Sequence, residues 1–186
     1  MESLRLFSKR MVHYLLLFQI LWIFSCEYKS PQPVDPIDLL PPITQTGENT
    51  FGYLVDGEAS FTVSPLNVVA RYSGQNLFIA GDIFRPLGQT IALISNTDFI
   101  QSVPATYAIN DSTPVFAEYT KIRPRPVCLY TTDSAIGGAL TIHYLDTINS
   151  IISGTFEFKA LSTDDSQEGC PDTVNITDGR FDLQYK

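Results

Sequence analysis

The sequence predicts an all-β fold: a single antiparallel meander domain, either barrel-like or a β-sandwich. Two observations lead to this prediction. From residue 49 onward the chain consists of short runs rich in Val, Ile, Thr, Tyr and Phe, separated by Gly, Pro, Asn and Asp. These are the residue types of strands and turns. In addition, no window of this region shows the hydrophobic period of an amphipathic helix.

Twelve runs are expected to form strands. Asp56-Gly57 separates the first two, and Ser73-Gly74-Gln75 separates the next two. Such residues favour tight turns, so at least the first part should fold as hairpins. The predicted strands are residues 50–55, 58–63, 67–72, 76–84, 89–95, 106–110, 114–121, 127–131, 139–146, 151–161, 174–177 and 180–185.

Alternation is clearest in residues 151–161. Phe156 and Phe158 stand between the polar residues Glu157 and Lys159. Because successive side chains of a strand point to opposite faces, this pattern predicts one buried face and one solvent-exposed face. The run is typical of a half-buried antiparallel strand.

The last two runs are out of phase with each other. Val174 and Ile176 share one face, whereas Phe181 and Leu183 fall one step out of that pattern. A shift of one residue would move every hydrophobic side chain to the wrong face. The sequence Asp178-Gly179 must therefore absorb the shift, as either a tight turn or a β-bulge.

The N-terminus has the order of a secretory signal. Basic residues in the first ten positions precede the uncharged stretch 11–24, and Ser25 stands directly before Cys26. The apolar stretch is too short for a bilayer core, which needs about 20 residues. The tetrad Ile23-Phe24-Ser25-Cys26 resembles the lipobox of bacterial lipoproteins, in which the cysteine carries lipid. We therefore predict a lipoprotein signal peptide over residues 1–25 and lipidation at Cys26, rather than an ordinary signal with an incidental cysteine.

A tether and one domain are predicted after the signal peptide. Residues 26–46 hold the lipidated cysteine and five of the chain's 12 prolines. Proline fixes φ and removes a hydrogen-bond donor, so this segment is interpreted as an extended tether. Residues 47–186 are predicted to form the all-β domain, which is long enough for one hydrophobic core.

The net charge limits the classes of partner. The chain carries a formal net charge of −8, and removal of residues 1–25, with three basic residues and one acidic residue, leaves −10. Nucleic acids are bound through basic surfaces. An acidic domain of this kind is therefore not expected to bind nucleic acid.

Two cysteines remain when Cys26 carries lipid. Exported proteins meet an oxidising compartment, so Cys128 and Cys170 are predicted to form a disulfide. The alternative is a pair of free buried thiols, since sequence spacing does not show that the two side chains approach each other.

Common catalytic motifs are absent: the sequence has no Gly-x-Ser-x-Gly, Ser-x-x-Lys or His-Glu-x-x-His, and no glycine-rich phosphate loop. No catalytic residue, cofactor or metal ligand is predicted. His143 is interpreted as a surface or partly satisfied strand residue rather than a catalytic base, because the sequence nominates no nucleophile to accompany it.

Two charged segments allow alternative interpretations. The loop 164–172 holds four carboxylates, which favour a solvated acidic turn over a Ca²⁺ site, since the spacing is not that of an EF-hand. Lys121, Arg123 and Arg125 form a basic stripe interrupted by prolines. It could bind a phosphate or carboxylate, but a charged, proline-blocked strand edge that prevents aggregation is favoured.

The C-terminal part of the chain contains a set of five short motifs. They are Tyr130-Thr-Thr-Asp133, Gly138-Ala-Leu-Thr-Ile142, Leu145-Asp146, Ile152-Ser-Gly-Thr-Phe-Glu-Phe158 and Val174-Asn-Ile-Thr-Asp-Gly-Arg-Phe-Asp182. Together with the opening Thr46-Gly-Glu-Asn-Thr-Phe-Gly-Tyr-Leu-Val-Asp-Gly57, this set resembles the small lipoproteins of uncharacterised function found in Bacteroidota. The resemblance implies an all-β, envelope-anchored domain. It carries over no catalytic or binding residues.

The expected function is that of a bacterial cell-envelope lipoprotein of the outer membrane, facing either the periplasm or the cell surface, that acts as a non-enzymatic binding or assembly module. Its expected partners are the membrane, through the lipid anchor, and an envelope protein, glycan or small ligand. The alternative is a lipocalin-like carrier whose barrel holds a small apolar ligand. The two differ in whether inward side chains such as Phe156 and Phe181 fill the core or line a cavity.

Overall fold

A computed structural model describes residues 33–73, 76–83, 88–95, 100, 102–122, 125–163 and 169–186. Residues Val34–Lys186 form one compact unit, and the predicted signal peptide and Cys26 lie outside the described residues. The elements are the 3-10 helix η1 (Pro36–Leu39) and the strands β1 (Thr50–Val55), β2 (Glu58–Thr62), β3 (Val68–Tyr72), β4 (Leu77–Ile83), β5 (Gln89–Ser95), β6 (Ala105–Ile109), β7 (Val115–Lys121), β8 (Cys128–Thr131), β9 (Gly138–Asp146), β10 (Ile151–Ser162) and β11 (Thr173–Gln184).

The predicted all-β fold is confirmed. The first ten predicted strands coincide with β1 to β10 to within one residue at each end. The last two predicted strands are parts of the single strand β11. Sequence alternation therefore located the strands well, and the difference at β11 has a local cause.

That cause is a β-bulge, one of the two alternatives that the phase shift left open. Phe156 of β10 faces Gly179 of β11, whereas Phe158 faces Ile176, so β11 has one extra residue here. Asp178 takes up the distortion with a φ of +53°. Because the bulge resets the alternation, apolar side chains on both sides of it face the core without a turn in the chain.

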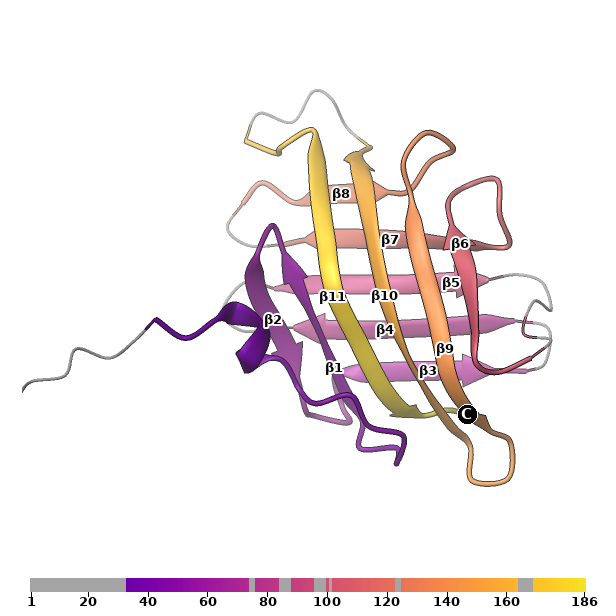
Figure 1. Cartoon of the computed structure of the whole chain (residues 1–186). Coiled ribbons are helices and arrows are strands. Elements are labelled where there is room, and N and C mark those ends of the chain that lie inside the picture. The colour runs from indigo at the N-terminus through magenta and orange to yellow at the C-terminus, as the bar shows by residue number, and fades with distance from the viewer. Residues whose placement is uncertain are drawn as a thin grey trace, which may run out of the picture. The chain divides into compact units, whose positions relative to one another are not determined.

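The strands form two layers that pack face to face (Figure 1). One layer has the strand order β2-β1-β11-β10-β9-β6 and the other β8-β7-β5-β4-β3. In Figure 1 the strands of the second layer run across those of the first. Consecutive hairpins build β1–β2, β3–β4–β5 and β9–β10–β11, while the first strand pairs with the last.

Three links join the edges of the layers. β6 pairs with β7 in parallel through Ile109 and Val115, and β8 pairs with both β7 and β10. After β11, the backbone of Lys186 exchanges hydrogen bonds of 3.3 Å and 3.1 Å with Tyr72 and Ala70 of β3. Because these links join edges of the two sheets, the two layers close into a flattened barrel.

Aromatic rings fill the centre of the barrel. The Phe156 ring lies 5.4 Å from Phe51, 6.3 Å from Phe158 and 6.4 Å from Phe181, measured between ring centroids. Packing is so close that a Cβ added to Gly81 would overlap the Phe51 ring. The predicted inward positions therefore fill the core in this part of the barrel.

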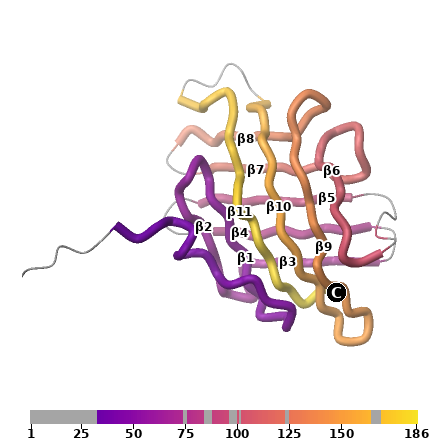
Figure 2. Tube along the Cα trace, viewed as in Figure 1, coloured from indigo at the N-terminus to yellow at the C-terminus, as the bar shows by residue number. Residues whose placement is uncertain are grey.

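The segment before β1 lies on the barrel instead of leaving it at residue 46. Leu40 is only 7 % exposed, and a Cβ at Gly52 of β1 would meet the Pro41 ring at 2.7 Å. Figure 2 shows this indigo part of the trace following the side of the domain that carries β1 and β2. Part of the proline-rich segment is thus packed structure.

Candidate functional site

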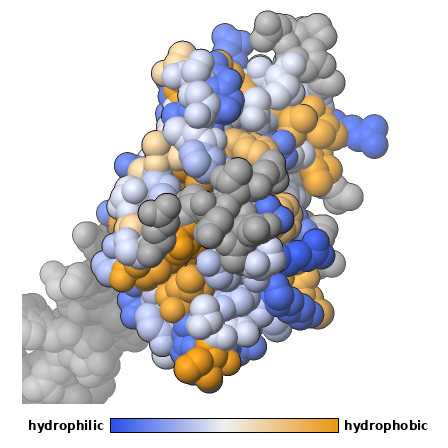
Figure 3. All heavy atoms as spheres, turned by 90° about the vertical axis from the view of Figure 1, so that its right-hand side faces the viewer, coloured by the Kyte–Doolittle hydropathy of each residue, from blue (hydrophilic) through white to orange (hydrophobic). Residues whose placement is uncertain are grey.

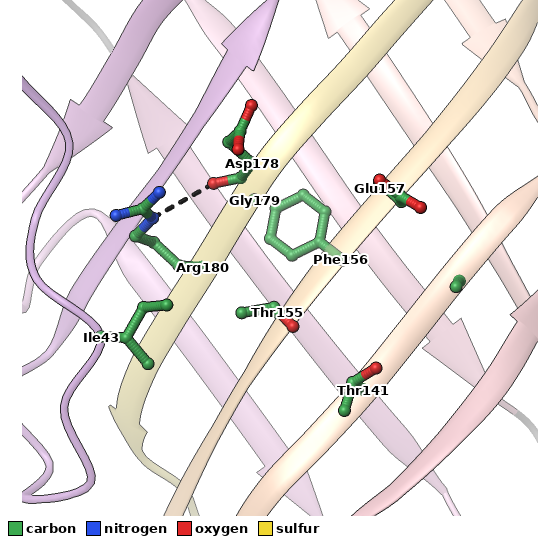
Figure 4. A pocket seen from close by; sticks show the side chains of 9 residues that line it. Ile43, Thr141, Thr155, Phe156, Glu157, Asp178, Gly179 and Arg180 are labelled. Atoms are coloured by element: carbon green, nitrogen blue, oxygen red, sulfur yellow. Dashed lines mark hydrogen bonds between the residues drawn. The ribbon is translucent and has the colours of Figure 1, made fainter. Parts of the chain in front are cut away.

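A recess opens on the outer face of the layer that contains β9, β10 and β11. It has a volume of about 330 Å³ and is bordered by Ile43 of the N-terminal segment. We call it the outer-face recess; its lining is Ile43, Ala139, Thr141, Thr155, Phe156, Glu157, Asp178, Gly179 and Arg180. Figure 4 shows Ile43 and Arg180 on one side of it and Thr141 and Glu157 on the other.

Strand register aligns the hydrogen-bonding groups of this recess. Thr106 pairs with Thr141, Thr141 with Thr155, and Thr155 with Arg180, on four adjacent strands. Directly paired residues present their side chains on the same face. The hydroxyl oxygens of Thr106 and Thr141 are 2.8 Å apart, and His143 Nε2 lies 3.0 Å from the Thr155 hydroxyl. The result is a polar row across the sheet.

Arg180 is held at the end of this row by the main chain. Its Nε donates to the carbonyl oxygen of Asp178 at 3.2 Å, and an Nη donates to the carbonyl oxygen of Pro41 at 3.4 Å. Within the described part of the chain Arg180 has no ion-pair partner. The bulge that corrects the phase of β11 thus also places a guanidinium group at the recess (Figure 4).

One buried carboxylate fixes the N-terminal border of the recess. Asp182 is 1 % exposed and accepts hydrogen bonds from the hydroxyl of Thr44 at 2.6 Å and the backbone of Thr46, Gly47 and Glu48 at 2.8 to 3.3 Å. Burial would raise the pKa of Asp182, but the hydrogen bonds outweigh burial and lower that pKa. The carboxylate therefore anchors the segment in its ionised form.

A second recess, of about 260 Å³, opens at the end of the barrel where the β1–β2 turn lies. We call it the end recess. Its lining residues come from the β1–β2 turn, β5, β7, β8 and the start of β11: Val55, Asp56, Glu58, Gln89, Tyr119, Lys121, Tyr130, Pro171, Thr173 and Val174. Inward positions are polar here, in contrast to the aromatic centre.

The tyrosines of the end recess are deeply buried. Tyr119 is 1 % and Tyr130 is 2 % exposed, with ring centroids 5.7 Å apart. Burial, followed by the proximity of Tyr130 and Asp56, raises the pKa of Tyr119 above its ordinary value, so its hydroxyl is neutral. That hydroxyl has no hydrogen-bond partner among the described residues.

The predicted disulfide is confirmed. Cys128 and Cys170 are bonded, with their Cα atoms 5.7 Å apart, which excludes the alternative of two free thiols. The bond connects β8 to the segment that leads into β11. It therefore lies beside the end recess, to which Tyr130 and Pro171 both contribute.

The predicted basic stripe is only partly described. Lys121 ends β7 and lines the end recess, Arg125 is exposed before β8, and Arg123 lies outside the described residues. Binding of an anion by this stripe stays a prediction. Of the acidic loop, residues 164–168 also lie outside the described part, and Asp172 is exposed.

Other surface features are assigned no role. Among the residues that the structure covers, no group of three or more His, Cys, Asp or Glu is placed to hold a metal ion. Leu66 and Ile148 are each 91 % exposed. Figure 3 shows hydrophobic residues in separate patches between hydrophilic ones on the side that lies at the right in Figure 1.

Apart from Lys121, the polar groups of both recesses were not predicted from the sequence. Tyr119 and Tyr130 belong to strands that were predicted, but tyrosine is also an ordinary strand residue. Convergence of these two side chains with Gln89 depends on pairing between strands that are distant in sequence. A polar residue at an inward position of a strand, such as Gln89 in phase with Ile91 and Leu93, is the local signal that the sequence contained.

Comparison with protein-family models, with curated proteins and with solved structures finds no match to this chain. Its site is therefore interpreted from its own geometry. Among the described residues, no helix has the length and hydropathy needed to cross a membrane.

Proposed function

We propose that this chain is a cell-envelope lipoprotein of the outer membrane, anchored by lipid on Cys26, whose β-domain is a non-enzymatic binding module. The N-terminal signal pattern supports the anchor. The outer-face recess is the single observation that carries the binding role, because it combines a hollow with aligned hydrogen-bonding side chains.

The chemistry of the outer-face recess suits a hydroxyl-rich chain, such as an envelope glycan. Thr141 and Thr155 can each donate and accept hydrogen bonds, Glu157 accepts, and Arg180 donates. A sugar hydroxyl also donates and accepts, so it can pair with every group in this set. The row extends along four strands to Thr106, which favours an elongated ligand over a compact one.

The packing of the interior favours this proposal over the carrier. The rings of Phe51, Phe158 and Phe181 each contact the Phe156 ring where a carried apolar ligand would have to lie. Both described recesses are lined in large part by polar side chains. Binding at the surface of the barrel therefore agrees better with the observed geometry.

A glycan-binding assay with matched arginine variants tests the proposal. The full chain in detergent is applied to an array of bacterial envelope glycans, and dissociation constants are measured for any glycan retained. Arg180→Gln should weaken binding at least about tenfold, since it removes charge-assisted hydrogen bonds. Arg71→Gln, which alters an exposed arginine of β3 that lies over the Phe78 ring of β4, should leave binding unchanged. Equal effects of the two substitutions, or retention of no glycan, would contradict the proposal.

A further inference from the structure

The Tyr119 hydroxyl is a buried polar group with no hydrogen-bond partner among the residues that the structure describes. Buried hydroxyls nearly always have a hydrogen-bond partner, because leaving one unsatisfied costs about 1 to 3 kcal/mol. Tyr119 lies on β7 and lines the end recess. A group from outside the described chain that enters this recess would therefore find a ready hydrogen-bond donor and acceptor.

Two other polar side chains that line the end recess, Gln89 and Asp56, are held in place by hydrogen bonds. Gln89 Oε1 accepts from Ser60 at 2.9 Å and from the Tyr53 hydroxyl at 3.4 Å, so its amide N–H groups are not used by these two residues. Asp56 Oδ1 accepts from the backbone of Asn175 at 2.9 Å. That contact holds the carboxylate in place beside the recess before any ligand arrives.

Charged groups of both signs line the end recess without pairing. Lys121 supplies an ammonium group, whereas Asp56 and Glu58 supply carboxylates, and none of the three forms an ion pair with a described residue. An anionic ligand would be repelled by the carboxylates and a cationic ligand by the lysine. A hydroxyl group, in contrast, can accept from Lys121 and donate to a carboxylate.

We infer that the end recess is a second binding site, for a small neutral polyol of the size of one monosaccharide, and that Tyr119 forms a hydrogen bond to it at the base of the site. The volume of about 260 Å³ is below the range typical of drug-sized ligands, which starts near 300 Å³. The site does not depend on the outer-face recess. It lies on different strands, with the exception of β11.

Removal of one oxygen tests this inference. Saturation-transfer NMR and titration of the full chain in detergent, with glucose, galactose and N-acetylglucosamine as probes, should detect binding of at least one sugar. Tyr119→Phe should raise its dissociation constant roughly 2- to 12-fold, the value of one hydrogen bond. The same variant should fold at least as stably as the wild type, because the lost hydroxyl was unpaired. Tyr144→Phe, which removes a hydroxyl that donates to Asp146 on β9, should leave the dissociation constant unchanged.

A second variant tests the contribution of the lysine that lines the site. Lys121→Gln should also weaken sugar binding, while Arg180→Gln in the outer-face recess should not. Three results would overturn the inference: no sugar binds, the amino acid glycine binds in place of sugars, or Tyr119→Phe destabilises the domain and leaves binding unaltered. Loss of glycan binding by Arg180→Gln alone bears on the outer-face recess and leaves this test unaffected.

Discussion

The centre and the margin of the barrel are stabilised in different ways. At the centre, the side chain of Phe156 contacts three other phenylalanine rings. At the margin, single specific links hold segments in place: the Cys128–Cys170 bond and the Asp182 carboxylate. Burial of apolar surface is the dominant favourable contribution to folding, so the centre gives the barrel its stability, but such contact is non-directional. Specific links determine where the recesses form.

Substitution at the centre should have the largest effect. Phe156→Ala removes a buried ring from four-ring packing, so the free energy of unfolding should fall by about 3 to 5 kcal/mol. Glu157→Ala, at the neighbouring exposed position, should cost under about 1 kcal/mol. Urea denaturation of the two variants measures the difference. Similar midpoints would show that the centre is not the main source of stability.

Reduction of the disulfide should have a smaller effect, located at the margin. The two cysteines are 42 residues apart, and loss of a bond that closes such a loop lowers stability by about 2 to 4 kcal/mol. Cys128→Ser and Cys170→Ser should each reproduce the effect of reductant. Their effects should not add in the double variant, because either substitution removes the same bond. Thermal unfolding with and without reductant provides the measurement, and additive losses would refute the expectation.

The same contrast explains how far the sequence could be interpreted. Strands at the centre were located because their alternation is a local signal: Phe156 and Phe158 against Glu157 and Lys159. The sequence left a turn and a bulge open at Asp178, since both correct a one-residue phase shift. The choice between them depends on pairing with β10 and β1 on either side, which is a property of the folded sheet.

Margin contacts had no comparable local signal. Asp182 looks like an ordinary strand-surface residue in the sequence, yet it is buried because the segment around Thr46 folds over it. A proline-rich composition predicts an extended backbone correctly, but it does not say whether that backbone lies in solvent or against the domain. For the same reason the outer-face recess, which this segment borders, was not predicted.

Removal of the Asp182 charge should have the smallest of the three effects and a distinctive pH dependence. The carboxylate accepts hydrogen bonds from Thr44 and the backbone of Thr46, Gly47 and Glu48. Asn retains one acceptor oxygen of the same shape, so Asp182→Asn should cost about 1 to 2 kcal/mol near neutral pH. A urea midpoint shift of this size, with hydrogen exchange accelerated in residues 44–48, is the expected result.

The pH dependence follows from the sign of the pKa shift. Hydrogen bonding lowers the folded-state pKa of Asp182 below its ordinary value of 3.8, so the unfolded chain binds a proton more readily than the folded chain. The contribution of Asp182 is therefore complete well above pH 3.8 and is lost as the pH falls through that value towards the folded-state pKa. Asp182→Asn should flatten the acid limb of a stability–pH curve, whereas Asp111→Asn, on an exposed turn, should leave the curve unchanged. Parallel curves for wild type and Asp182→Asn between pH 5 and pH 3, about the range in which a free aspartate titrates, would show that this carboxylate does not hold the margin in its ionised form.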